Sequence, residues 1–149
     1  MRNIRKIDKN LKNYPFNYKN KIMKKRSYTL VTGSAGFIGY HLTSSLIKKN
    51  KHVIGIDNLN NYYSIKLKQD RIKDLKKINK KYFIFHKLDL SNKKRIENLF
   101  KKYKITEVIN LAAQAGVRYS ITNPEKYIKS NIIGFHNLIS CSIKAKVKM

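Results

Sequence analysis

Three glycines at three-residue spacing constrain the fold of this chain more than any other feature. Gly33, Gly36 and Gly39 stand between a β-prone run at residues 28–32 and a helix predicted over residues 37–49. Glycine allows a sharp turn at the first position, close approach of a ligand at the second and close helix packing at the third. A buried strand, a glycine loop and a helix in this order predict a phosphate-binding turn, because free N–H groups at the helix N-terminus attract anions.

An acidic residue further along the chain supports a dinucleotide site. Asp57 ends a second predicted strand, residues 52–57, 18 positions after Gly39. A carboxylate there can accept hydrogen bonds from both ribose hydroxyls of an adenosine and would repel a 2′-phosphate. The pattern therefore favours NAD over NADP. Taken singly, the glycines also fit a flexible turn and Asp57 fits an ordinary strand-end turn.

The rest of the chain repeats the alternation of strand and helix. Further strands are predicted at residues 82–88 and 107–113, and helices near residues 64–77, 93–103 and 124–145. This order predicts an α/β fold, a Rossmann-like doubly wound parallel sheet with helices on both faces. We expect residues 27–149 to form a partial NAD-binding Rossmann domain, truncated before the fifth strand, and residues 1–26 to be a basic tail.

In the helix predicted over residues 37–49, apolar residues recur at four-residue spacing. Ile38, Leu42 and Leu46 form this series. We expect it to be the stripe that packs against the sheet.

The net charge of +26, from 34 Lys and Arg against 8 Asp and Glu, raises the question of nucleic acid or an anionic membrane. The excess is spread along the whole chain, which favours a compositional bias over a binding stripe; attraction of an anionic nucleotide is the alternative. We expect no nucleic-acid partner, no membrane span and no metal site. Cys141 is the only cysteine, so no intrachain disulfide forms, and a cytoplasmic location is the default.

Several segments resemble one enzyme family. They are VTGSAGFIGYHL at residues 31–42, GIDNLNNYY at 55–63, VINLAAQAGVRYS at 108–120 and SNIIG at 130–134. The chain is similar to the extended short-chain dehydrogenase/reductases, in particular to the NAD-dependent nucleotide-sugar epimerases and dehydratases. QAGVR favours the UDP-glucuronate 4-epimerases over UDP-glucose 4-epimerases and dTDP-glucose 4,6-dehydratases.

The resemblance implies a cofactor site built from the glycine loop and the following strand ends. In such enzymes Asp57, Asn58 and Asn61 would line the adenosine ribose, and Asp89 with Leu90 would border the adenine. The whole implied set is Gly33, Ala35, Gly36, Phe37, Ile38, Gly39, Asp57, Asn58, Asn61, Asp89, Leu90, Leu111, Ala112, Ala113, Gln114 and Asn131.

Two further roles have plain alternatives. Ser130 or Asn131 could reach toward the nicotinamide, and helix packing or capping explains them equally well. Arg118 could bind an anionic substrate through its planar fork of donors, although a solvated arginine is an equal alternative.

The reaction of this family needs a Tyr-x-x-x-Lys pair, in which the lysine lowers the pKa of the tyrosine so that it can exchange a proton with the sugar. Only Tyr62 and Lys66 fit this spacing, and they follow the second strand at the adenosine end, so we interpret the match as coincidental. No catalytic residue is assigned.

The resemblance implies an isomerase that moves the C4 hydride of a nucleotide sugar, UDP-glucuronate by preference, reversibly to NAD in polysaccharide biosynthesis. We expect this chain to be an inactive N-terminal fragment of such an enzyme, whose full-length form is compatible with a homodimer. The alternative from another class is a noncatalytic NAD-binding module.

Overall fold

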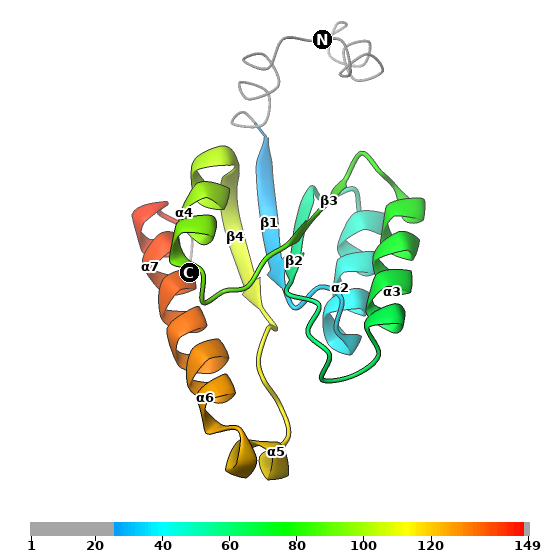
Figure 1. Cartoon of the computed structure of the whole chain (residues 1–149). Helices are drawn as coiled ribbons and strands as arrows, with labels where there is room; N and C mark the ends of the chain where they lie inside the picture. The colour runs from blue at the N-terminus through cyan, green and yellow to red at the C-terminus, as the bar shows by residue number, and fades with distance from the viewer. Residues whose placement is uncertain (1–25, 148–149) are drawn as a thin grey trace, which may run out of the picture.

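The computed structural model describes residues 26–147, which form a parallel sheet between two layers of helices (Figure 1). The strands lie in the order β3-β2-β1-β4, and every neighbouring pair is parallel. Their bounds are β1 Ser27–Thr32, β2 Val53–Asp57, β3 Phe83–Lys87 and β4 Lys104–Asn110. The expected α/β, Rossmann-like parallel sheet is confirmed. The basic tail predicted at residues 1–26 lies almost wholly outside the described residues.

Each face of the sheet is covered by its own pair of helices. On one face α2 (Phe37–Lys48) and α3 (Ile65–Ile78) pack on a core that includes Val31 and Val53. On the other face α4 (Lys93–Lys102) and α7 (Phe135–Lys144) pack on a core that includes Leu30. Neighbouring residues of β1 thus enter opposite cores, because side chains alternate along a strand. A central strand buried on both faces explains its continuous apolar run.

The buried stripe of α2 differs from the prediction. Gly39, Thr43 and Ile47 are the buried residues of this helix, whereas Ile38 is 66% exposed. Leu42 and Leu46 are only partly buried at the edge of the core. The prediction was wrong for Ile38 because Gly39, and not Ile38, packs against the glycine loop after β1. This contact sets the rotation of the helix.

The strand predicted at residues 107–113 begins and ends earlier, at Lys104–Asn110. Its pairing with β1 runs from Ser27 opposite Lys104 to Thr32 opposite Asn110, so the ladder stops where β1 stops. The expected helix at 124–145 is also more varied. Its parts are α6 (Pro124–Tyr127), a π-helical segment η2 (Ile128–Gly134) and α7, and a short helix α5 (Val117–Thr122) that was not predicted comes before them.

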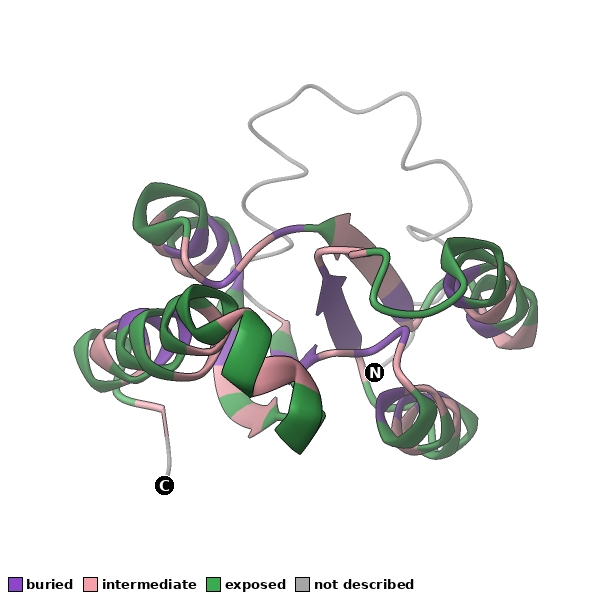
Figure 2. Cartoon of the chain, turned by 60° about the horizontal axis from the view of Figure 1, so that its bottom comes forward, coloured by how far each residue is buried: buried purple, intermediate pink, exposed green. Residues whose placement is uncertain are grey.

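The loops that follow the four strands meet at the carboxyl edge of the sheet. Figure 2 turns this edge toward the viewer and shows a buried strand at the centre of the sheet, outer strands of mixed burial, and helices whose outer surfaces are exposed. In parallel α/β sheets, ligands bind outside the carboxyl ends of the strands. The sheet therefore places the candidate site at this edge.

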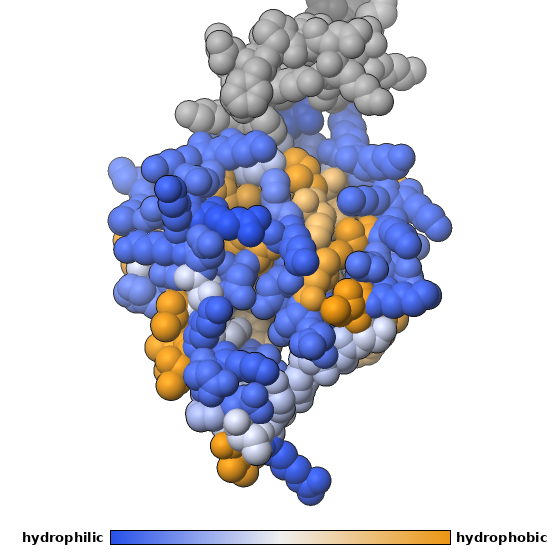
Figure 3. Space-filling view, viewed as in Figure 1, coloured by the Kyte–Doolittle hydropathy of each residue, from blue (hydrophilic) through white to orange (hydrophobic). Residues whose placement is uncertain are grey.

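Hydrophilic side chains cover most of the surface seen in Figure 3, with smaller apolar areas between them. Within residues 26–147 no helix is both long enough and apolar enough to cross a membrane.

Candidate functional site

A cavity of about 160 Å³ opens at the carboxyl edge of the sheet, between the glycine loop and the loops after β2, β3 and β4. Its lining includes residues from all four of these loops and from η2. Among the residues proposed from the sequence, those that line it are Gly33, Gly36, Asp57, Asn58, Asp89, Leu90, Leu111, Ala112, Ala113, Gln114 and Ser130. Residues separated by about 80 positions in the chain are thus brought to one cavity, as the strand order requires.

The glycine loop is shaped by its backbone. Gly33 has a φ of +65°, and a Cβ there would stand 2.9 Å from the backbone nitrogen of Ala112, so a larger residue fits neither the turn nor the space. Gly36 is the N-cap of α2 and provides no side-chain cap, whereas Ser64 caps α3 and Asn92 caps α4. Within the described chain, the first turn of α2 thus leaves N–H groups available to an anion beside the cavity.

Thr32 joins the glycine loop to the loop after β4. Its fully buried hydroxyl accepts hydrogen bonds from the backbone N–H groups of Leu111 and Ala112, each at 3.0 Å. The same hydroxyl donates to Oδ1 of Asn110 at 2.5 Å. One side chain therefore satisfies the backbone where the β1–β4 ladder ends, and it fixes one wall of the cavity against the glycine loop.

Asp57 is held between two backbone segments at the end of β2. Its Oδ2 accepts the N–H of Ala35 at 3.3 Å, and its Oδ1 accepts the N–H of Leu59 at 2.8 Å. The residue is 8% exposed and still borders the cavity. These two hydrogen bonds fix the carboxylate at the border of the cavity, and its contact with a ribose stays a prediction.

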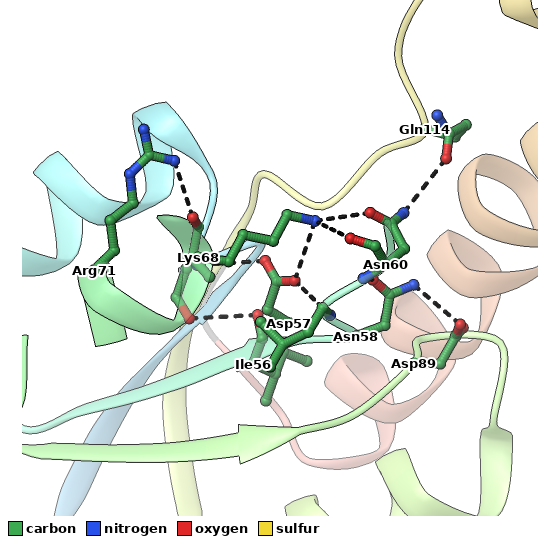
Figure 4. A network of polar contacts seen from close by, with 11 residues as sticks. Ile56, Asp57, Asn58, Asn60, Lys68, Arg71, Asp89 and Gln114 are labelled. Atoms are coloured by element: carbon green, nitrogen blue, oxygen red, sulfur yellow. Dashed lines mark hydrogen bonds and ion pairs between the residues drawn. The ribbon is translucent and has the colours of Figure 1, made fainter. Parts of the chain in front are cut away.

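Lys68 on α3 was missed by the sequence reasoning. It is 4% exposed, lines the cavity and directs its ammonium to the loop after β2 (Figure 4). Burial lowers the pKa of Lys68, while the Asp57 carboxylate opposes that shift. A signal was present, because Lys68 stands four and seven positions before the buried Ile72 and Leu75 and so lies on their face of the helix.

Asp89, at the end of β3, provides a second carboxylate beside the cavity. Its Oδ1 accepts hydrogen bonds from the N–H and the hydroxyl of Ser91, at 2.9 and 2.7 Å, and Oδ2 accepts from Asn58 Nδ2 at 3.2 Å. Burial by itself would raise the pKa of Asp89, but these hydrogen bonds outweigh it and the pKa is lowered. The carboxylate therefore stays ionised as an acceptor at this end of the cavity.

Asn131 on η2 fixes the loop after β4. Its Oδ1 accepts the Gln114 N–H at 2.8 Å, and its Nδ2 donates to the Gln114 carbonyl at 3.0 Å. Gln114 in turn accepts from Asn60 Nδ2 at 3.5 Å across the cavity. Asn131 thus uses its amide to hold the backbone, which is the packing alternative considered for it, and its neighbour Ser130 lines the cavity.

Other proposed residues lie beside the cavity and not on its lining. Ala35 is fully buried and contributes its N–H to Asp57, and Gly39 packs under the loop. Phe37 and Ile38 are 68% and 66% exposed at the start of α2, and Asn61 is exposed. Contact with a ligand by these residues remains a prediction.

Arg118 is exposed on α5 and lines a shallow depression with Tyr119 and with Tyr62, which also lines the cavity. The rings of Tyr62 and Tyr119 lie 5.2 Å apart between their centroids. Lys66 forms an ion pair with Asp70 at 3.2 Å, with 86% of its side chain exposed. Tyr62 and Lys66 thus have different partners, and the interpretation of their spacing as coincidental stays a prediction.

Comparison with known proteins identifies the same fold and family. A family model described as GDP-mannose 4,6 dehydratase matches residues 30–149. Protein CapI of Staphylococcus aureus is 53% identical over 76% of this chain and 33% of its own length. A UDP-glucuronate 4-epimerase of Thermodesulfobacterium geofontis is 46% identical over 75% of this chain and 34% of its own. The chain therefore spans about a third of the length of these relatives.

A solved structure supports the assignment. The UDP-glucuronic acid 4-epimerase of Bacillus cereus, in complex with NAD and a 4-deoxy-4-fluoro derivative of UDP-glucuronic acid, has a TM-score of 0.71 at 32% identity. It aligns with 81% of this chain, which covers 38% of that protein. The glycine loop, the carboxylate at the end of β2 and these matches agree: the chain belongs to the family of NAD-dependent nucleotide-sugar epimerases and dehydratases.

Proposed function

We propose that the cavity at the carboxyl edge of the sheet binds NAD. The observation that carries this proposal is the arrangement of the uncapped α2 N-terminus, the glycine loop and Asp57 around one opening. The backbone at Gly33 and Gly36, where added side chains would meet other backbone atoms, suits the pyrophosphate. Asp57 would accept the ribose hydroxyls with Asn58 beside it, and Asp89 with Leu90 would border the adenine.

We further propose that the parent activity is UDP-glucuronate 4-epimerisation, as the name of the Thermodesulfobacterium relative suggests. NAD, when bound, supplies a reversible acceptor for the hydride at C4 of the sugar. The part of this chain is to hold and orient the dinucleotide. We also propose a cytoplasmic location, which the single cysteine supports, and a role for the parent enzyme in supplying sugar precursors for polysaccharide.

Calorimetry of the 149-residue chain with NAD tests the binding proposal. We expect saturable binding that Asp57→Ala weakens by at least about tenfold, because the carboxylate loses both ribose hydroxyls. Asp70→Ala is the matched control, since Asp70 pairs only with surface lysines of α3 among the contacts described. Wild-type protein that does not bind NAD, or equal weakening by both substitutions, would contradict the proposal.

The catalytic part of the proposal has its own test. Because Lys66 is paired with Asp70 and not with Tyr62, we expect NAD binding without turnover in this chain. Incubation with NAD and UDP-glucuronate, followed by NMR of the sugar C4 proton, should show no UDP-galacturonate. Formation of that product would require a catalytic pair other than the one this family uses.

A further inference from the structure

The cavity contains a buried cation that an NAD site of this kind does not by itself require. The Lys68 side chain is 5% exposed, and its Nζ lies 2.7 Å from Asn60 Oδ1 and 3.1 Å from the Asn60 carbonyl. Nζ also lies 3.9 Å from Asp57 Oδ1 and 4.4 Å from the centre of the Tyr63 ring. Four contacts from three residues hold the ammonium beside the carboxylate, and Figure 4 shows those with Asn60 and Asp57.

The charge of Lys68 changes what Asp57 presents to a ribose. A lone carboxylate at the end of β2 repels a 2′-phosphate. Here both side chains are more than nine-tenths buried, so water screens their interaction only weakly and the pair presents little net charge. The repulsion that a 2′-phosphate meets is therefore reduced by a cation on the same side of the cavity.

A second cation, Arg71, contacts the glycine loop. Arg71, one turn after Lys68 on α3, donates from Nη1 to the Ala35 carbonyl at 3.1 Å. The N–H of Ala35 donates to Asp57, so Arg71 is connected to this carboxylate through the backbone of Ala35. The other carboxylate of the cavity, Asp89, is engaged by Ser91 and Asn58 further along the strand ends.

We propose that Lys68 is a specificity-determining residue of the adenosine-ribose subsite, an inference that rests on the proposed NAD site. Its ammonium offsets the Asp57 carboxylate, so that the site prefers NAD and still accepts NADP. Asn60, which the same ammonium fixes, completes the subsite wall. Asp57 and Lys68 therefore jointly set the ratio of the NADP dissociation constant to the NAD dissociation constant.

The test is calorimetry of the full chain with NAD and with NADP. Lys68→Met keeps an unbranched apolar side chain and removes the charge, so we expect the ratio of the NADP to the NAD dissociation constant to rise about tenfold. Asp57→Asn should lower the same ratio. Lys66→Met removes an equal charge from the exposed side of α3 and should leave the ratio unchanged.

Lys68→Arg keeps the charge and provides a second measurement if the Met variant does not fold. Its ratio should stay within about threefold of wild type, because the nearby positive charge is retained. Three results would overturn this inference but not the proposed NAD site. They are an unchanged ratio in Lys68→Met, a tenfold change in Lys68→Arg, and wild-type protein that binds NAD but not millimolar NADP. Wild-type protein that binds neither dinucleotide would overturn the proposed function as well.

Discussion

Gly39 on α2 lies so close to Gly33 that a Cβ atom on Gly39 would stand 2.1 Å from the Gly33 carbonyl oxygen. The helix is pressed against the turn that precedes it, and the position of its N-terminus depends on that contact. Because the neighbour is backbone, it cannot rotate away as a side chain could.

Gly39→Ala should therefore destabilise the chain by about 3 kcal/mol, because the added methyl forces α2 away from the glycine loop. Urea unfolding followed by circular dichroism measures the change. Ser45→Ala, on the exposed side of the same helix, is the control and should change stability by less than about 0.5 kcal/mol. Equal stability of wild type and Gly39→Ala would show that the helix can shift at no cost.

Thr32→Val should lower the free energy of unfolding by about 2 kcal/mol, because it leaves the Leu111 and Ala112 N–H groups without their shared acceptor. Thr43→Val is a closely matched control. Thr43 is also fully buried, and its hydroxyl has no partner within residues 26–147, so its replacement should be neutral or stabilising. Chemical denaturation measures the free energy of unfolding of both variants. A larger loss of stability in Thr43→Val than in Thr32→Val would refute the role of the Thr32 hydroxyl as the shared acceptor.

Asn131→Ala should release the backbone of Gln114 and accelerate hydrogen exchange of its N–H, with a loss of about 1 kcal/mol in stability. We also expect weaker NAD binding, because Gln114 lines the cavity. Asn98→Ala, at an exposed position of α4, is the control. Unchanged exchange at Gln114 would mean that other contacts suffice to hold this loop.

The pH dependence of stability should include a contribution from His86. Burial lowers the pKa of this histidine from 6.5, and Lys102 and Arg95 lower it further. Below about pH 6.5 the unfolded chain binds this proton more readily than the folded chain, so stability falls as the pH drops toward the folded pKa. Above pH 6.5 the contribution is constant.

Thermal unfolding of wild type and His86→Gln from pH 5 to pH 8 measures this effect. The difference in stability between the two proteins should be constant above about pH 6.5 and should shift in favour of the variant as the pH falls. A difference that does not vary with pH would exclude His86 as a source of acid sensitivity.

The sequence was sufficient for the sheet and for most of the cavity, because these depend on local patterns. The glycine spacing placed the turn, and apolar runs placed the strands, with β4 displaced along the chain because its end is set by pairing with β1. Asp57, Asp89 and the residues after β4 follow from strand ends that lie side by side in any such sheet. Local pattern thus predicted which loops meet.

What the sequence did not reveal depends on contacts between distant segments. Ile38 resembles a core residue, but the approach of Gly39 to Gly33 turns it outward. The spacing of Lys68 to Ile72 and Leu75 indicates its helix face, but the partners that allow a charge to be buried there, Asp57, Asn60 and Tyr63, come from another segment. A charged side chain can be buried only where partners compensate its charge, and helical periodicity does not identify those partners.

The π-helical segment Ile128–Gly134 has a consequence for how the C-terminal helices are indexed. A π turn takes up an additional residue, so the residues on either side are out of phase by roughly 100° relative to an uninterrupted α-helix. That offset allows Asn131 to engage the loop after β4 while Asn137, Leu138 and Cys141 face inward on α7. Deleting one residue from this segment would rotate Asn131 relative to α7. Either the contact of Asn131 with Gln114 or the packing of α7 against the core would then be lost.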